Sequence, residues 1–212
     1  MLEHRHVAIE EKHSYKMSFV VGGLFLNESI ELVHLHDAGA DWNETRELAL
    51  ARGIFSLPKA ASRRRTLREI ISRLSKLNER EVRHFAEAGE RTDQQSLLWL
   101  AVCREYRFVQ EFAIEVVRER FLSLQIALPL QAFDTFFAAK AEWNEGLAKI
   151  SPATRTKLRQ VLFRIMREAG IISPENTILA TYISPRLHGI ISEQNPLDLN
   201  IFPGLKDDRG IA

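Results

Sequence analysis

Hydrophobic positions recur at helical spacing along most of this chain. The clearest case is the stretch 151–170, whose apolar positions form a single stripe: Leu158, Val161, Leu162, Ile165, Met166 and Ala169. Ser151 is a suitable N-cap, Pro152 suits the first helical position, and Gly170 can adopt the left-handed conformation that ends a helix. The pattern therefore predicts a helix from Ser151 to Ala169 with one buried face.

The same reasoning predicts further helices separated by capping residues and breaks. They cover about 24–36, 41–52, 59–77, 78–89, 93–124 and 129–143, with a short helix at 184–191. The segment 93–124 contains no Gly or Pro and is apolar around much of its circumference. A helix of this kind is buried on most sides. We expect it to form the centre of the molecule, either continuous or kinked near 103–105.

A different pattern follows Gly170. Two short β-prone runs, 171–172 and 177–179, flank the turn-forming residues 173–176, which predicts a β-hairpin. Together with helices at 130–143 and 151–169, this hairpin gives the layout of a winged helix-turn-helix. The expected fold is mostly α: a multi-helix bundle with helix-turn-helix-like elements and a small C-terminal β-hairpin.

Two subdomains are expected within this fold. Residues 17–90 are predicted to form an N-terminal helical, helix-turn-helix-like subdomain with a basic third helix. Residues 91–193 are predicted to form the central buried helix and the winged-helix-like part. The ends, 1–16 and 194–212, are polar or rich in Pro and Gly, so we expect them to be flexible or loosely docked.

Composition restricts the class of protein. Hydrophobic residues make up 45% and charged residues 27% of the chain, which is typical of a globular protein. A single cysteine, Cys103, excludes an internal disulfide framework. No signal peptide is recognisable, and no apolar run approaches the roughly 20 residues that a membrane helix needs. These features favour a cytoplasmic protein with no membrane contact.

Charge is informative through its distribution, because the net charge is only +1. From 149 to 167 there are six Lys or Arg and no Asp or Glu, and from 59 to 76 there are seven basic residues and one acid. Polyanions such as DNA are bound by clustered Lys and Arg side chains. The candidate DNA-binding residues are Lys59, Arg63, Arg64, Arg65, Arg68, Thr154, Arg155, Lys157, Arg159 and Arg164. The plainer alternative for both helices is a solvated charged face.

Signals for catalysis are absent from the sequence. There is no H-E-x-x-H pattern, no paired cysteine spacing and no G-x-S-x-G motif, and the seven histidines are scattered. We therefore expect no metal site, no cofactor and no enzymatic activity.

Four ordered blocks resemble the BrxA family, the A proteins of bacterial BREX (bacteriophage exclusion) systems. They are Ser18–Ser29, Leu98–Phe108, Phe136–Trp143 and Thr156–Gly170. The resemblance covers about 18–191 and implies a mostly helical, cytoplasmic protein that binds DNA through helix-turn-helix-like elements. It also implies a setting beside a methyltransferase, an alkaline-phosphatase-like protein and an ATPase. It supplies no catalytic residues.

The sequence therefore predicts a non-enzymatic, double-stranded DNA-binding accessory protein of a phage-defence system. The alternative is a protein–protein adaptor whose basic faces dock on acidic surfaces of other defence components.

Overall fold

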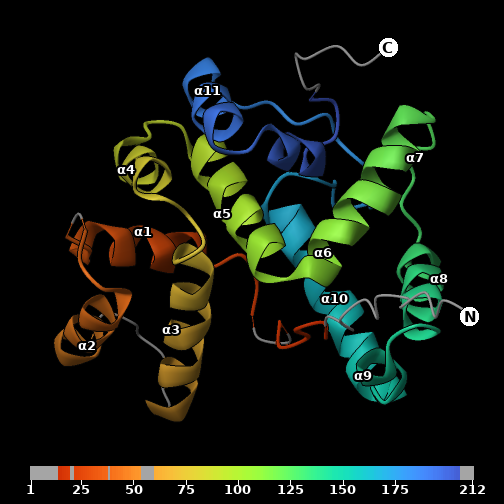
Figure 1. Ribbon diagram of the computed structural model, residues 1–212, viewed down its shortest axis with the longest axis horizontal. Coiled ribbons are helices and arrows are strands. Elements are labelled where there is room, and N and C mark those ends of the chain that lie inside the picture. The colour runs from red at the N-terminus through yellow and green to blue at the C-terminus, as the bar shows by residue number, and fades with distance from the viewer. Residues whose placement is uncertain (1–13, 20–21, 38, 54–59, 206–212) are drawn as a thin grey trace, which may run out of the picture.

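Helix α5 lies at the centre of the molecule, and helices from both halves of the chain surround it (Figure 1). The computed structural model describes residues 14–19, 22–37, 39–53 and 60–205. Over these residues the helices are α1 Leu26–Leu35, α2 Trp42–Arg52, α3 Ala60–Leu74, α4 Glu79–Glu87, α5 Arg91–Glu105, α6 Arg107–Phe112, α7 Glu119–Leu122, α8 Leu130–Ala141, α9 Glu145–Ala148, α10 Pro152–Glu168 and α11 Pro185–Gln194, with a π-helix η1 at Ala113–Arg118 and a 3-10 helix η2 at Pro196–Ile201. The expectation of a mostly helical fold is confirmed.

The predicted central helix is divided at Tyr106. This residue has extended backbone angles (φ −122°, ψ 91°), so α5 ends before it and α6 begins after it. Trp99, Phe108 and Phe112 on the two sides of the break are fully buried. The expectation of a kink near 103–105 is confirmed, with the break at the next residue.

Helices α1 to α4 cover one side of α5, and α6 to α10 lie towards the other (Figure 1). Local signals explain most of their ends. Asp41 caps α2, Ser151 caps α10 and Ser184 caps α11, each through its side-chain oxygen. Asn78 and Glu81 form a reciprocal capping box at the start of α4. One hydrophobic core extends from Phe19 to Phe202 and is continuous across the expected subdomain boundary at 90/91.

The predicted β-hairpin and winged-helix arrangement are wrong. Between 171 and 179 the pairing is reduced to isolated bridges, Ile172 with Ile178 and Ala127 with Thr177, and the described residues contain no strand. Ile178 donates its backbone N–H to the carbonyl of Ile126 at 2.7 Å. The segment thus packs on the α7–α8 linker, and Ile172 and Ile178 are only 2% exposed. Apolar side chains that would have lined an exposed wing are used in the core.

The C-terminal segment is also more ordered than the sequence indicated. Leu199, Ile201 and Phe202 are at most 1% exposed, and the indole Nε1 of Trp99 donates to the carbonyl of Ile201 at 3.1 Å. A loosely docked end is therefore the wrong description for 196–202. At the other end, the hydroxyl of Tyr15 donates to Glu111 at 2.5 Å. Residues 1–13 and 206–212 lie outside the described part of the chain.

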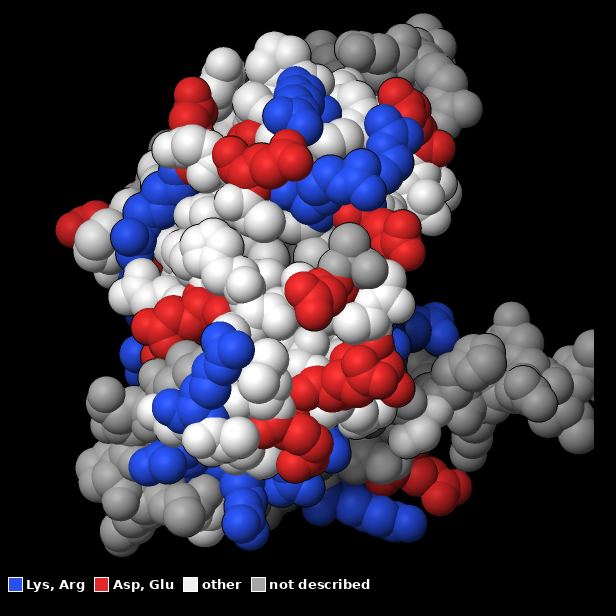
Figure 2. Space-filling model, turned by 90° about the vertical axis from the view of Figure 1, so that its left-hand side faces the viewer, with Lys and Arg blue, Asp and Glu red and all other residues white. Residues whose placement is uncertain are grey.

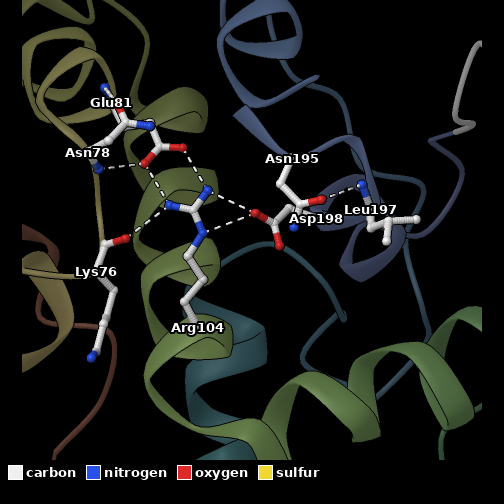
Figure 3. Close-up of polar contacts among 7 residues, drawn as sticks. All are labelled: Lys76, Asn78, Glu81, Arg104, Asn195, Leu197 and Asp198. Atoms are coloured by element: carbon white, nitrogen blue, oxygen red, sulfur yellow. Dashed lines mark hydrogen bonds and ion pairs between the residues drawn. The ribbon is translucent and has the colours of Figure 1, made fainter. Parts of the chain in front are cut away.

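Arg104 of α5 connects the preceding helix α4 with η2, which lies far along the chain (Figure 3). Its Nη1 and Nη2 atoms donate to the two carboxylate oxygens of Glu81 in α4 at 2.7 and 2.8 Å, and Nη2 also donates to Asp198 in η2 at 2.8 Å. Nη1 further donates to the carbonyl of Lys76. Burial alone would lower the pKa of Arg104, but its bonds to Glu81 and Asp198 raise it. This fork geometry holds α4 and η2 against α5.

Candidate nucleic-acid interface

Helix α3 is amphipathic, with its apolar stripe in the core and most of its arginines outside. Leu67, Ile70 and Leu74 are at most 1% exposed, whereas Arg64, Arg65 and Arg68 are exposed. Because residues three and four apart lie on the same side of a helix, Arg64, Arg65 and Arg68 follow the outer side of its N-terminal half. Packing of the apolar stripe thus directs this part of the positive charge into solvent.

The single acidic residue of α3 points inward and does not neutralise this outer side. Glu69 accepts a hydrogen bond from Arg73 Nε at 2.9 Å and another from the hydroxyl of Tyr106. Arg73 is itself only 2% exposed and donates Nη1 to the carbonyl of Gly23 at 2.8 Å. The acid of α3 is consequently occupied by the scaffold.

Arg64, Arg65 and Arg68 form no side-chain hydrogen bond or ion pair with any part of the chain that the structure describes. Positive charge near the N-terminus of a helix is also unfavourable to the helix dipole. Figure 2 shows Lys and Arg gathered along the lower edge of the face that it presents, at the level of the N-terminal end of α3 in Figure 1. We name Arg64, Arg65 and Arg68 the α3 arginine cluster.

Two other predicted residues of this region stand apart from the cluster. Arg63 is half-buried and has polar contacts of its own. Lys59 lies outside the described residues. Among the predicted α3 residues that the structure describes, the exposed ones are Arg64, Arg65 and Arg68.

Helix α10 uses its first arginines in a different way. Arg155 Nε donates to Asp134 Oδ1 of α8 at 3.1 Å, and Arg159 pairs with the other oxygen of the same carboxylate. The guanidinium of Arg155 also lies over the ring of Phe137, 4.8 Å from its centroid. One acid of α8 thus binds two cations of α10, and both cations help to hold the two helices together.

The remaining predicted residues of α10 are dispersed. Arg164 Nε pairs with Glu168 one turn later at 2.7 Å. The hydroxyl of Thr154 lies 3.0 Å from that of Ser151, within the helix cap. Lys157 is exposed and has no side-chain polar partner among the described residues. Thr154, Arg155, Arg159 and Arg164 therefore have polar partners within the chain, whereas Lys157 has none among the described residues.

The difference between the arginines of α3 and those of α10 is caused by acids on neighbouring helices. The sequence of one helix alone does not show which acid its arginines contact. Asp134 precedes Arg155 by 21 residues, so no periodicity within one helix links the two. A useful sign in the sequence is the position of Asp134 between Phe133 and Phe136, since both phenylalanines are buried against the core. An acid beside such positions lies close to the helix that packs on them.

Two other kinds of site, a metal centre and a reactive cysteine, can be checked in the described residues. These residues contain no group of three or more His, Cys, Asp or Glu side chains placed to hold a metal ion. Cys103 is buried, and burial raises the pKa of its thiol well above the usual value. Within the same part of the chain, no helix has the combined length and apolar character needed to cross a membrane.

Comparison with known proteins decides the family. The BrxA family model matches residues 13–195. The chain belongs to the BrxA family. A BREX protein BrxA of Bacillus cereus (strain H3081.97) is 25% identical over 158 residues, covering 74% of this chain and 78% of the relative. A BREX protein BrxA of Escherichia coli O9:H4 (strain HS) is 23% identical over 180 residues, covering 84% of each chain.

These names identify BrxA as a component of BREX phage-defence systems. The fold of this BrxA-family chain also occurs in a solved structure. A crystal structure of an uncharacterized protein from Magnetospirillum magneticum superposes with a TM-score of 0.74 at 20% identity, covering 89% of this chain and 97% of the other. At this level of identity the likeness concerns the fold alone.

Proposed function

We propose that this BrxA-family protein is a non-enzymatic accessory protein of a BREX system that binds double-stranded DNA in the cytoplasm. The main support is the α3 arginine cluster, because three exposed cations on one side of a helix have no partner in the described chain. Exposed guanidinium groups of this kind form charge-assisted, often bidentate contacts with phosphates.

The proposal concerns phosphates rather than bases. Phosphate contacts position a protein on a duplex and carry no sequence information directly. On α10, the exposed residues Lys157 and Arg167 can add contacts, since Lys157 has no polar partner among the described residues and Arg167 donates only to the neutral side chain of Asn176. Arg155 and Arg159 are bound to Asp134. We further expect contacts with the methyltransferase, the alkaline-phosphatase-like protein or the ATPase of the same system, as the resemblance implies.

A salt titration of duplex binding tests this proposal. The logarithm of the binding constant should fall linearly with the logarithm of salt concentration, with a slope of about 0.9 for each phosphate neutralised. The variant Arg64→Ala/Arg65→Ala/Arg68→Ala should bind more weakly, and its slope should be shallower by about 2 to 3.

A matched control removes three arginines that already have acidic partners. Arg46, Arg107 and Arg186 pair with Glu47, Glu111 and Glu87 at 2.9, 2.7 and 2.9 Å. Their triple replacement by Ala makes the same change in net charge, and we expect it to alter the slope much less. Absence of duplex binding at low salt, or equal effects of the two triple variants, contradicts the proposal.

A further inference from the structure

Helix α4 has an exposed ridge that is separate from the α3 arginine cluster. Its inner residues Glu81, His84 and Phe85 are buried. Its outer residues are Glu79, Arg80, Arg83, Ala86 and Glu87, all exposed. We name these five residues the α4 ridge.

The two ends of this ridge are tied to α11. Arg80 Nη1 pairs with Glu193 at 2.5 Å, and Arg186 Nη2 pairs with Glu87 at 2.9 Å. These pairs neutralise Arg80 and Glu87 within the chain. The hollow between the two helices also includes Arg83 and Gly189, and the position above Gly189 is open.

Glu79 and Arg83 remain without a side-chain hydrogen bond or ion pair in the described part of the chain. They are four residues apart, so they project from the same side of α4 one turn apart. The ridge therefore presents one negative and one positive side chain in a row, and neither has a polar side-chain partner in the described part of the chain.

An apolar hollow of about 300 Å³ adjoins the same two residues, between α4 and the corner that joins α1 to α2. Its apolar lining includes Val33, Trp42 and Val82. Trp42 is half-buried and stacks on His36 with 3.8 Å between the ring centroids. Apolar surface therefore lies beside the unpaired charges, and its burial by a partner would be favourable.

The charge pattern decides what can cover it. Arg80, Arg83 and Arg186 are balanced here by Glu79, Glu87 and Glu193, so this surface has no excess of positive charge for a phosphate backbone. Figure 2 shows Lys or Arg and Asp or Glu side by side over the upper part of the face. A surface of alternating sign fits a protein.

The order of the charges makes the ridge complementary to itself. When two copies of α4 pack antiparallel about a two-fold axis, Glu79 of each copy lies opposite Arg83 of the other. One symmetric contact then forms two intermolecular ion pairs. We propose that the protein self-associates through the α4 ridge into a two-fold dimer, with the Trp42 hollow covered at the interface. This inference does not depend on DNA binding.

Sedimentation velocity of the full chain over a range of concentrations tests the dimer. We expect a monomer–dimer equilibrium that is weakened by salt. In the variant Arg83→Glu, Glu79 of each copy faces a glutamate of the other copy. In the variant Glu79→Arg, Arg83 of each copy faces an arginine. Both variants therefore replace two attractive pairs with two repulsive ones. Each single variant should raise the dimer dissociation constant about tenfold or more.

The double variant Glu79→Arg/Arg83→Glu distinguishes a docking contact from a structural role. It reverses both charges, so the same two-fold contact pairs them again and dimerisation should return towards the original value. Lys149→Glu, at the C-cap of α9, makes the same charge change as Arg83→Glu at the other end of the molecule and should leave the equilibrium unchanged. Circular dichroism of each variant establishes that it is folded.

The proposal is overturned if the unmodified chain is monomeric at every concentration. It is also overturned if Arg83→Glu leaves a dimer intact, if Lys149→Glu weakens the dimer equally, or if the folded double variant does not recover. Loss of DNA binding in the α3 cluster variant has no bearing on these outcomes, so the two proposals fail independently.

Discussion

Helices α3 and α10 have similar sequences in physical terms and different surroundings. Each has an apolar stripe in the core and a surplus of Lys and Arg on its other sides. In α3 the one acid turns inward and Arg64, Arg65 and Arg68 remain free. In α10, an acid of α8 binds Arg155 and Arg159.

The comparison teaches that a charge surplus along a helix does not measure the charge that is available to a ligand. Opposite charges about 3 to 4 Å apart interact strongly enough to compete with an outside partner, especially when they are partly shielded from water. Whether a basic helix can bind DNA therefore depends on the acids of the helices that pack beside it. Three predictions, in order of decreasing effect, test this difference between α3 and α10.

The largest effect is expected from substitutions in the buried faces of α3 and α10. Here the two helices should lose similar amounts of stability. Leu67 of α3 is 1% exposed and Leu162 of α10 is 0% exposed. Replacing either by Ala should lower the free energy of unfolding by about 2 to 5 kcal/mol, because the lost contacts leave a cavity. Urea denaturation measures it. A much smaller loss for Leu67→Ala would mean that α3 is only loosely attached, which contradicts the arrangement described above.

An intermediate effect is expected when α10 is made to resemble α3. Asp134→Ala removes the partner of Arg155 and Arg159, and the free energy of unfolding should fall by about 1 to 2 kcal/mol, since the groups are partly exposed. The freed arginines should also steepen the salt dependence of duplex binding. Glu47→Ala, which breaks the exposed pair with Arg46 at 2.9 Å, is the control and should cost less. Equal losses in the two variants would show that Asp134 has no special role.

The smallest effect is a pH dependence at the C-terminal end of α3. Glu105, the last residue of α5, lies against this end of α3. Burial by itself would raise the pKa of Glu105. Hydrogen bonds from Lys16 and Ser72 and the charges of Lys16 and Lys76 outweigh burial, so the pKa lies below its usual value. The carboxylate therefore stabilises the fold above its unfolded pKa of about 4.3, and this contribution is lost as the pH falls through the folded pKa.

The variant Glu105→Gln has no carboxylate at this position, so it lacks this contribution at every pH. We expect it to be less stable than the unmodified chain at neutral pH, with the difference narrowing as the pH falls below the unfolded pKa. Urea midpoints measured across this range give the result. A difference that stays constant or widens on acidification would mean that the ionised carboxylate does not support the fold.

Much of the helical framework could be predicted because its signals are local. Ser151, Pro152 and Gly170 mark the ends of α10, and Asn78 and Glu81 mark the start of α4. The winged hairpin failed for a non-local reason: Ile172 and Ile178 have the β-prone character of a hairpin, but the core and the α7–α8 linker offer them better burial.

The candidate site was predicted in part. The exposed position of Arg64, Arg65 and Arg68 follows from the apolar period of α3, so the sequence was sufficient to place them on the surface. The pairing of Asp134 with two arginines of α10, and the contact of Arg104 with Glu81 and Asp198, join residues 21 to 94 positions apart. No periodicity within one helix contains that information.

The sequence by itself determined that this protein is helical, which faces of its helices are apolar, and that it belongs with BrxA. These properties depend on neighbours within a turn or two, or on ordered blocks of residues. Only the tertiary structure decided which cations remain free, because an ion pair depends on distance in space. It left Arg64, Arg65 and Arg68 of α3 in solvent, it bound Arg155 and Arg159 of α10 to Asp134, and it exposed Glu79 and Arg83 as an unused pair of opposite charges.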